Sequence, residues 1–446
     1  MRTPFSTIQL MFMFMFMFMF GTASLQAWGS CSMSGVTQTE DDRTALIPFG
    51  KINLYDTYFY PVGALLGSVV VPPTNYTYGG ATASSVLWTC DATDISNIYF
   101  LVATNGDDRV GGYYDIGAVD GMSDVYATYF AYVGIKQTMS DVVLTRYWKK
   151  VPVTSYATSG TKIQIRLQDI PPLHAELYRV STLPGTSAGS YYCGNNNTAG
   201  SGIVFGTTTG ANYTCTQPNA YIQLVGPGLT SDAEGQDSAT NYKFWGADNG
   251  FGYGMRAVNR LYNTPSCVAR SATPLVLLPT ISINDLNNGL SSSASFNVTV
   301  ECSDSVTSGT ETAQTALGFQ VSAGAYSAAE TLGLVNSNQG VSMLLSDDYT
   351  ASTSAQGVGI TLAYSNAPNS PLMLIGQTGI DPLNPNYMGT SAGWYPVLNN
   401  AIAAGSTVSG YTNYSYDFIA TLKKINGQTV TAGNVRSTVT VLVKVQ

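Results

Sequence analysis

Short runs of hydrophobic residues, separated by turn residues, recur along most of the chain. The runs are rich in Val, Ile, Tyr and Thr, and clear examples lie at residues 96–104, 161–170, 295–302 and 358–364. Runs of this kind between Gly, Pro, Asn and Ser residues are typical of β-strands, and many of them in succession are typical of sandwiches or barrels. Helical periodicity is almost absent. The pattern therefore predicts an all-β protein.

The N-terminal run follows a different pattern. Residues 11–20 are Met-Phe repeated five times, so both alternating residues are apolar and the repeat has no polar face. The apolar run is also well short of the ~20 residues that a membrane-spanning helix needs. A basic residue precedes it and small residues follow it, as in a secretory signal peptide. We expect a signal peptide over residues 1–27, cleaved after Ala27, with cleavage after Ala23 as the alternative.

The composition excludes some classes of function. Charged residues make up 10% of the chain, against a usual ~25%. The formal net charge is −8 without a basic cluster, which argues against nucleic-acid binding because phosphates are bound by concentrated Lys and Arg. Hydrophobic residues reach 44%, enough for a sizeable core. No stretch after the signal peptide is long and apolar enough to span a bilayer, so we expect an exported chain.

Six cysteines form an even set in this exported chain, so disulfides are the default expectation. Their distribution suggests sequential pairing, although other connectivities remain open. No CxxC motif occurs and His174 is the one histidine, so we expect no zinc or other metal site. GFGYG at 250–254 precedes no helical pattern, so we expect no dinucleotide and no other cofactor. The expected pairs are Cys31 with Cys90, Cys193 with Cys215, and Cys267 with Cys302.

The chain is long enough for more than one domain. At residues 261–267, LYNTPSC, Asn, Thr and Pro interrupt the strand pattern just before a new segment that begins with a cysteine. We therefore expect an N-terminal domain over residues 28–264 and a C-terminal domain over residues 265–446, both of them β-sandwiches.

The C-terminal end carries the sharpest signal. After a predicted strand, YDFIATLKKI, the Asn426-Gly427 pair predicts a hairpin turn. The final strand then places a row of valines on one face, interrupted only by Ser437. Natural proteins normally blunt an exposed edge strand, and this one is apolar to its end. We expect another chain to pair with it; the alternative is a terminal strand packed inside its own sandwich. The row consists of Val435, Val439, Val441, Val443 and Val445.

The segment AGNVRSTVTVLVKVQ resembles the C-terminal signature of chaperone–usher pilins, with Gly433 fourteenth from the end and alternating hydrophobic residues after it. The segments at 267–302 and 356–364 resemble two further parts of a pilin domain, whereas Val445 stands where the family usually has an aromatic residue. The resemblance implies an incomplete immunoglobulin-like sandwich that lacks its last strand. The resemblance also implies that the resulting groove accepts a strand, first from a periplasmic pilus chaperone and then, at an outer-membrane usher, from an adjacent pilin subunit.

Cleavage after Ala27 would leave only residues 28–30 before Cys31, too few for a donor strand. The chain would then accept a strand without giving one, which in this family is typical of the tip adhesin of type 1-like fimbriae. The N-terminal domain would be lectin-like and bind a host glycan or a matrix protein. We expect export through the periplasm to the fimbrial tip at the cell surface, and a function in cell adhesion.

Carbohydrate binding requires carboxylate and amide groups beside an aromatic face. The densest such cluster lies in ATNGDDRVGGYYDIG at 103–117, although a solvated hairpin tip would have the same composition. Other candidates are FWGADNGFGYGMR at 244–256, the polar segment at 194–214, and the mature N-terminus at Trp28. The predicted ligand-binding residues are Trp28, Asp107, Asp108, Arg109, Tyr113, Tyr114 and Asp115.

Three other classes of protein compete with this interpretation. An enzyme is disfavoured because a catalytic triad could use only His174 and no G-x-S-x-G motif occurs. A eukaryotic secreted glycoprotein is suggested by five N-x-[ST] triplets, but Asn297 falls inside a predicted core strand. A minor or structural pilus subunit is the third, and the missing donor segment argues against it.

Overall fold

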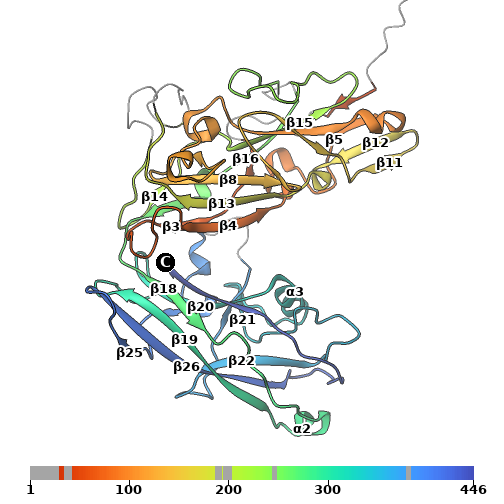
Figure 1. Ribbon diagram of the computed structural model, residues 1–446. Coiled ribbons are helices and arrows are strands. Elements are labelled where there is room, and N and C mark those ends of the chain that lie inside the picture. The colour runs from red at the N-terminus through yellow and green to blue at the C-terminus, as the bar shows by residue number, and fades with distance from the viewer. Residues whose placement is uncertain (1–29, 35–42, 186–192, 194–202, 244–248, 378–382) are drawn as a thin grey trace, which may run out of the picture.

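The structure is a computed structural model that describes residues 30–34, 43–185, 193, 203–243, 249–377 and 383–446. The predicted signal peptide and Trp28 lie outside these residues. Among the described residues, no helix is long and apolar enough to cross a membrane. The regular structure is mainly strand, as the hydrophobic pattern predicted, and Figure 1 shows the strands in two units, one above the other.

The described residues of the N-terminal unit form four sheets. Sheet A has the strand order β1-β5-β12-β11, sheet B has β10-β6-β15-β16-β2, sheet C has β14-β17-β3, and sheet D has β4-β13-β8-β7 with β9 beside β8. The strands of sheets A and B are β1 (Ser32–Met33), β5 (Val86–Asp91), β12 (Lys162–Arg166), β11 (Ala157–Ser159), β10 (Lys149–Pro152), β6 (Tyr99–Thr104), β15 (Ala220–Val225), β16 (Phe251–Gly254) and β2 (Ala45–Leu46). The strands of sheets C and D are β14 (Ala211–Asn212), β17 (Asn259–Tyr262), β3 (Gly50–Asn53), β4 (Leu65–Val71), β13 (Leu173–Arg179), β8 (Val133–Met139), β7 (Tyr126–Ala127) and β9 (Val142–Val143).

The C-terminal unit contains two sheets. One has the order β18-β19-β26-β22 with β25 beside β26, and the other has β21-β23-β20-β24 with β27 beside β20. Two short helices, α2 (Ile283–Asn287) and α3 (Ala323–Thr331), begin at the N-caps Ser282 and Ser322. The strands are β18 (Cys267–Ala272), β19 (Ser292–Ser303), β26 (Tyr411–Lys424), β22 (Val358–Tyr364), β25 (Ile402–Gly405), β21 (Gly340–Val341), β23 (Leu374–Ile375), β20 (Thr315–Val321), β24 (Trp394–Pro396) and β27 (Val439–Val445).

Each unit has its own hydrophobic core. The largest core of the N-terminal unit runs in sequence from Cys31 to Leu261, and that of the C-terminal unit from Cys267 to Val430. All three disulfides lie within a unit, and Cys267 and Cys302 face each other across the β18–β19 ladder. The other two join Cys31 to Cys90 and Cys193 to Cys215.

The predicted hairpin at Asn426-Gly427 is wrong. Gly427 does adopt a positive φ of 76°, so the turn forms. The strand before it, β26, pairs with β19, β22 and β25, whereas β27 pairs with β20 in the opposite sheet. After the turn the chain therefore crosses the sandwich instead of folding back beside β26. This crossing places the last strand on the edge of the second sheet.

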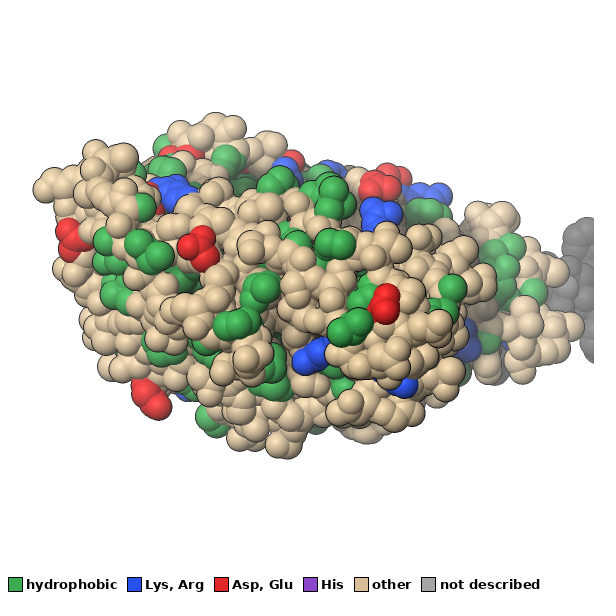
Figure 2. All heavy atoms as spheres, turned by 90° about the horizontal axis from the view of Figure 1, so that it is seen from below, with side chains coloured by type: hydrophobic (Ala, Val, Ile, Leu, Met, Phe, Trp, Pro, Cys, Tyr) green, Lys and Arg blue, Asp and Glu red, His purple; other side chains and the backbone are tan. Residues whose placement is uncertain are grey.

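Few charged side chains lie on the face that Figure 2 shows. Figure 2 views the molecule from below, on the side of the C-terminal unit in Figure 1, and shows scattered charged and hydrophobic side chains on a mainly neutral polar face. This face agrees with the 10% of charged residues in the sequence.

The two units contact each other through a loop after β3 that packs against β18, β19 and β26. The Tyr58 hydroxyl donates to the Glu301 carboxylate at 3.1 Å, and the Tyr411 hydroxyl donates to the Asp56 carboxylate. The rings of Tyr58 and Tyr411 lie 4.6 Å apart. The hydrogen bond to Asp56, followed by desolvation, raises the pKa of Tyr411 to about 12, so this donor stays protonated at neutral pH. We call this contact the interdomain latch; it comprises Asp56, Tyr58, Phe59, Arg270, Glu301 and Tyr411.

Candidate functional site

The outer edge of β27 is unpaired within the described part of the chain. β27 pairs with β20 along its whole length, with Val443 opposite Leu317 and Val441 opposite Phe319. Within the ranges that the structure describes, no strand pairs with its other edge. An edge of this kind carries free backbone N–H and C=O groups that a further strand can use. We call it the open edge of β27.

Hydrophobic side chains line the open edge without being fully covered. Val439, Val441 and Val443 pack against the core of the C-terminal unit but remain only half-buried. Val435 packs against the same core just before the strand, and Val445 is buried. The apolar face predicted from the alternating pattern is therefore the inner face of β27, and part of it stays accessible.

A second extended segment, residues 274–282, also lacks a partner strand in the structure. Its side chains alternate: Val276 and Leu278 pack on the C-terminal core, whereas Leu275 and Leu277 are 69% and 76% exposed. Thr273, just before it, donates its backbone N–H to Asn297. Two unpaired apolar segments thus cover one core incompletely, which is the arrangement expected of a sandwich that lacks a strand.

Gly433 lies where two backbone segments approach closely. A Cβ atom at this position would lie 2.4 Å from the backbone nitrogen of Ala355, and the next residue, Asn434, forms a bridge with Ser354. The neighbouring atoms belong to the backbone, so they cannot move away as a flexible side chain can. The glycine holds the segment before β27 against the body of the C-terminal unit.

We expect Gly433→Ala to lower the free energy of unfolding by about 1–3 kcal/mol, because the added methyl group overpacks a backbone contact. Chemical denaturation of the full chain measures the change. Gly427→Ala serves as a control for lost turn geometry, since nothing lies within 4 Å of a Cβ there although its φ is positive. Unchanged stability of the Gly433 variant would contradict a packing role for this glycine.

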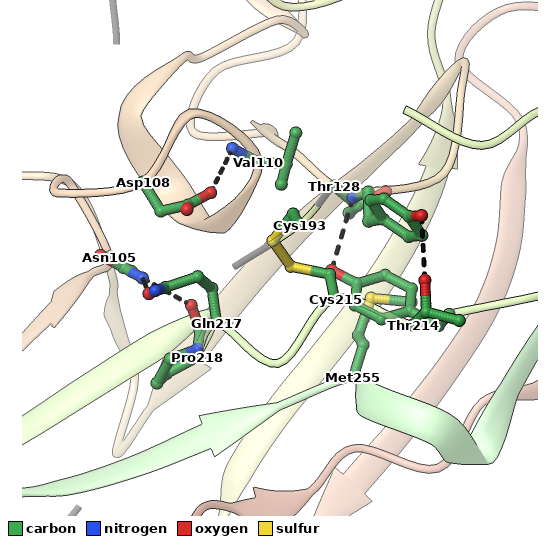
Figure 3. Close-up of a disulfide and its surroundings, with 12 residues drawn as sticks. Asn105, Asp108, Val110, Thr128, Cys193, Thr214, Cys215, Gln217, Pro218 and Met255 are labelled. Carbon is green, nitrogen blue, oxygen red and sulfur yellow. Dashed lines mark hydrogen bonds between the residues drawn. A yellow bond between two sulfur atoms is a disulfide. The ribbon is translucent and has the colours of Figure 1, made fainter. Parts of the chain in front are cut away.

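The residues predicted to bind a ligand separate into two groups. Asp108 and Arg109 are 2% and 1% exposed. The Asp108 carboxylate accepts from the Val110 backbone N–H at 2.7 Å, beside the Cys193–Cys215 disulfide (Figure 3). Arg109 donates to the backbone carbonyls of Pro184 and Gly185. The prediction that Asp108 and Arg109 contact a ligand is therefore wrong: they hold the loop together from inside.

Asp107 is exposed but lies apart from the other candidates. Its backbone N–H donates to the Asn105 side chain, which in turn donates to Gln217 and Pro218 (Figure 3). Desolvation by the surrounding protein raises the pKa of its carboxyl group. Asp107 is not among the residues that line the pocket formed by Tyr113, Tyr114 and Asp115.

Tyr113, Tyr114 and Asp115 lie together in an open pocket of about 460 Å³. Tyr113 ends a single wide helical turn, Arg109–Tyr113, that the Asp108 side chain caps, and Tyr114 and Asp115 follow this turn. The Tyr113 and Tyr114 rings meet edge to face with centroids 4.8 Å apart. The Asp115 carboxylate accepts from the backbone N–H groups of Asp124 and Val125, at 3.0 and 3.2 Å.

The rest of the pocket comes from residues that the sequence analysis missed, namely Tyr126, Arg146 and Tyr147. The Arg146 guanidinium lies 4.5 Å from the Tyr113 ring centroid and 5.5 Å from that of Tyr147, and it forms an ion pair with Asp237 at 2.9 Å. Burial raises the pKa of Tyr126 to about 12. The sequence TRYWKK at 145–150, where arginine precedes two aromatic residues, was the available signal. We call this pocket the tyrosine pocket.

The second candidate segment, at 244–256, lies inside the protein where it is described. Asn249 and Tyr253 are fully buried, and Asn249 accepts from the Trp88 indole N–H at 2.8 Å. Trp28, Trp245, Asp248 and residues 194–202 lie outside the described residues. Among the described residues, no group of three or more His, Cys, Asp or Glu side chains could hold a metal ion.

The fold and the open edge define a mainly β protein whose C-terminal sandwich is incomplete. The family model described as Fimbrial protein matches residues 257–446. The matched range covers the C-terminal unit and the end of the N-terminal unit. No curated protein sequence matches it.

Three solved structures are similar to the chain at low identity. The P pilus rod subunit PapA is 14% identical, with 40% of this chain and 99% of that chain covered and a TM-score of 0.22. The CupB6 tip adhesin from Pseudomonas aeruginosa is 12% identical, with coverage of 92% and 94% and a TM-score of 0.21. A chain of the CsuC-CsuE chaperone-tip adhesion subunit pre-assembly complex, from archaic chaperone-usher Csu pili of Acinetobacter baumannii, is 11% identical, with coverage of 93% and 99% and a TM-score of 0.20. At these identities and scores the likeness decides nothing about function.

Proposed function

We propose that the chain is a two-domain tip adhesin of a chaperone–usher fimbria. Its N-terminal domain, up to residue 264, binds a receptor, and its C-terminal domain, from residue 265, joins the fimbria by accepting a strand. The observation that carries the assembly role is the open edge of β27 over half-buried Val439, Val441 and Val443. The family match to residues 257–446 supports the same role.

Strand addition would supply partners for the free backbone groups of the open edge and would cover its half-buried valines. A strand laid beside β27 would hydrogen-bond to its free backbone groups and cover the valine row with its own alternating side chains. A periplasmic chaperone supplies the first strand and the adjacent subunit supplies the second at the outer-membrane usher. The Cys267–Cys302 disulfide, formed during export, fixes β18 against β19 before assembly.

The connection between the two units supports a place at the tip. β17 ends at Tyr262 and β18 begins at Cys267, so the fimbrial domain follows the N-terminal unit almost directly. A donor strand ahead of the fimbrial domain would need a free extended segment, and these few residues are held by hydrogen bonds between Thr264 and Asn53. The fimbrial domain thus receives a strand while the N-terminal domain faces outward.

The tyrosine pocket supports binding of a neutral glycan by the N-terminal domain. Tyrosine rings stack on the C–H face of a sugar, while hydroxyl, guanidinium and carboxylate groups bind its hydroxyls. Tyr113, Tyr147 and Asp115 offer these groups on an accessible wall of the pocket. A matrix protein is the alternative receptor.

We expect Tyr113→Ala and Tyr147→Ala each to weaken glycan binding about fivefold or more, because the stacking contact of one aromatic ring contributes ~1 kcal/mol or more. The measurement is binding of the full chain to a glycan array and to immobilised collagen. Tyr156→Ala is the matched control, since Tyr156 is a comparably exposed tyrosine outside the pocket. Full binding by both pocket variants, or binding to collagen alone, would contradict the glycan assignment.

A further inference from the structure

A cleft of about 720 Å³ lies between the two units. Strands β3 and β4 line it on the side of the N-terminal unit, and β20, β24 and β27 line it on the other side. Figure 1 shows the C-terminal end of the chain at this seam. Its volume falls within the range of small-molecule sites, roughly 300–1,000 Å³.

The charged side chains that line the cleft are both cationic. Lys51 on β3 and Lys444 on β27 both line it, and the described residues that line it include no Asp or Glu. Neither lysine forms an ion pair with any residue that the structure describes. Burial, and then the charges of Arg260 and Lys444, lower the pKa of Lys51 to about 8. Water reaches Lys444 from the cleft, but the protein surrounds it, and this desolvation lowers its pKa as well.

The remaining walls offer rings and amide oxygens. Trp394 and Tyr387 present aromatic side chains from the C-terminal unit. Gln320 and Gln377 donate their amide N–H groups to Gly376 and Val321, at 3.2 and 2.6 Å, so their orientation is fixed. Their amide oxygens are then available to accept hydrogen bonds from hydroxyl groups.

We propose that this cleft binds an acidic saccharide, with the carboxylate between Lys51 and Lys444 and the hydroxyls on Gln320 and Gln377. Two uncompensated cations favour an anion, since a buried charge without a partner is costly. The amides and rings favour a hydroxylated ring over a purely apolar acid. The cleft is formed by one chain, so binding there requires neither a donor strand nor a surface receptor.

The first test is isothermal titration of the full chain with D-glucuronate, D-glucose and acetate at pH 6.5 and pH 9. We expect D-glucuronate to bind at least tenfold more tightly than either of the other two at pH 6.5. Binding should weaken at pH 9, because Lys51 loses its proton as the pH rises through its pKa of about 8. Arg260, which faces Lys51, stays charged in this range, and Tyr60, whose pKa is raised by burial, stays neutral.

The variants Lys51→Met and Lys444→Met keep the aliphatic stem and remove the charge. We expect each to weaken D-glucuronate binding at least tenfold at pH 6.5. Lys162→Met is the control, because Lys162 is an exposed lysine outside the cleft, paired with Asp91. If a variant fails to fold, the wild-type chain still gives the answer: D-glucuronate should protect Lys51 and Lys444 from acetylation by acetic anhydride and leave Lys162 unprotected.

Three results would overturn the proposal. If D-glucose bound as tightly as D-glucuronate, the two lysines would not contribute to binding. Acetate binding or protecting as well as D-glucuronate would show a carboxylate site without saccharide recognition. Equal labelling of Lys51 with and without D-glucuronate would place any binding outside the cleft.

Discussion

Val441→Asp should lower the free energy of unfolding by about 2–4 kcal/mol and abolish capture of a strand by the C-terminal domain. Val441 lies opposite the buried Phe319 and packs on the core, so a carboxylate there would be desolvated without a hydrogen-bond partner. The same substitution would place a charge in the path of the incoming strand. Chemical denaturation and co-purification with the cognate periplasmic chaperone measure the two effects.

Thr440→Asp is the matched control for this prediction. Thr440 is the preceding residue of β27 and its side chain is exposed, so the substitution should change stability by no more than about 0.5 kcal/mol and leave strand capture intact. Equal effects of the two substitutions would show that negative charge near β27, and not the apolar inner face, decides the outcome.

Arg270→Met should lower the free energy of unfolding by roughly 1–3 kcal/mol and weaken the contact between the two units, because Arg270 pairs with Glu301 in the C-terminal unit and lies over Tyr58 and Phe59 of the other unit. Glu301 is 2% exposed and accepts from the Arg270 Nε at 2.7 Å and from the Tyr58 hydroxyl. Removal of the arginine leaves a buried carboxylate with only the tyrosine, and breaking a buried pair costs several kcal/mol. The estimate is reduced because the Arg270 side chain is 42% exposed.

Denaturation of the full chain and its radius of gyration by small-angle X-ray scattering measure this effect. We expect the Arg270 variant to be more extended than the parent chain. Glu301→Gln combined with Arg270→Met should recover much of the loss, because the neutral amide removes the unpaired charge. A double variant as unstable as Arg270→Met alone would show that the arginine acts through packing against Tyr58 and Phe59 instead.

The strands could be predicted from the sequence because the hydrophobic pattern that identifies a strand is local. The run at 358–364 is β22 with the same bounds, and the alternation after Gly433 correctly identified the apolar face of the last strand. A period of two needs only neighbouring residues, so no knowledge of the fold is required. The pairing partner of a strand cannot be predicted in this way. The Asn-Gly turn formed as predicted, but whether β27 pairs with β26 or with β20 depends on the packing of the whole sandwich.

Only part of the tyrosine pocket could be predicted from the sequence. Tyr113, Tyr114 and Asp115 are adjacent in the sequence, so the local composition was enough to predict them as candidate binding residues. Arg146 and Tyr147 join them from a segment more than 30 residues away, which only the fold brings near. Asp108 and Arg109 have the residue types of an exposed glycine-rich loop but are buried, because the backbone of residues 184–185 covers the arginine.

The interdomain cleft and latch could not be predicted from the sequence for a similar reason. Lys51 and Lys444 are almost at opposite ends of the chain, and neither lies in a charge cluster. Their proximity arises only when β3 and β27 meet at the seam between the units.

Strand acceptance at the open edge of β27 is the central claim, and hydrogen–deuterium exchange tests it most directly. The full chain is incubated with a twelve-residue peptide of alternating valine and threonine flanked by lysines, or with a permuted peptide of the same composition. We expect the alternating peptide to slow exchange in residues 439–445 and to raise the melting temperature, since a ligand of the folded state stabilises it. Unchanged exchange in β27 with the alternating peptide, or equal protection by the permuted one, would contradict the account.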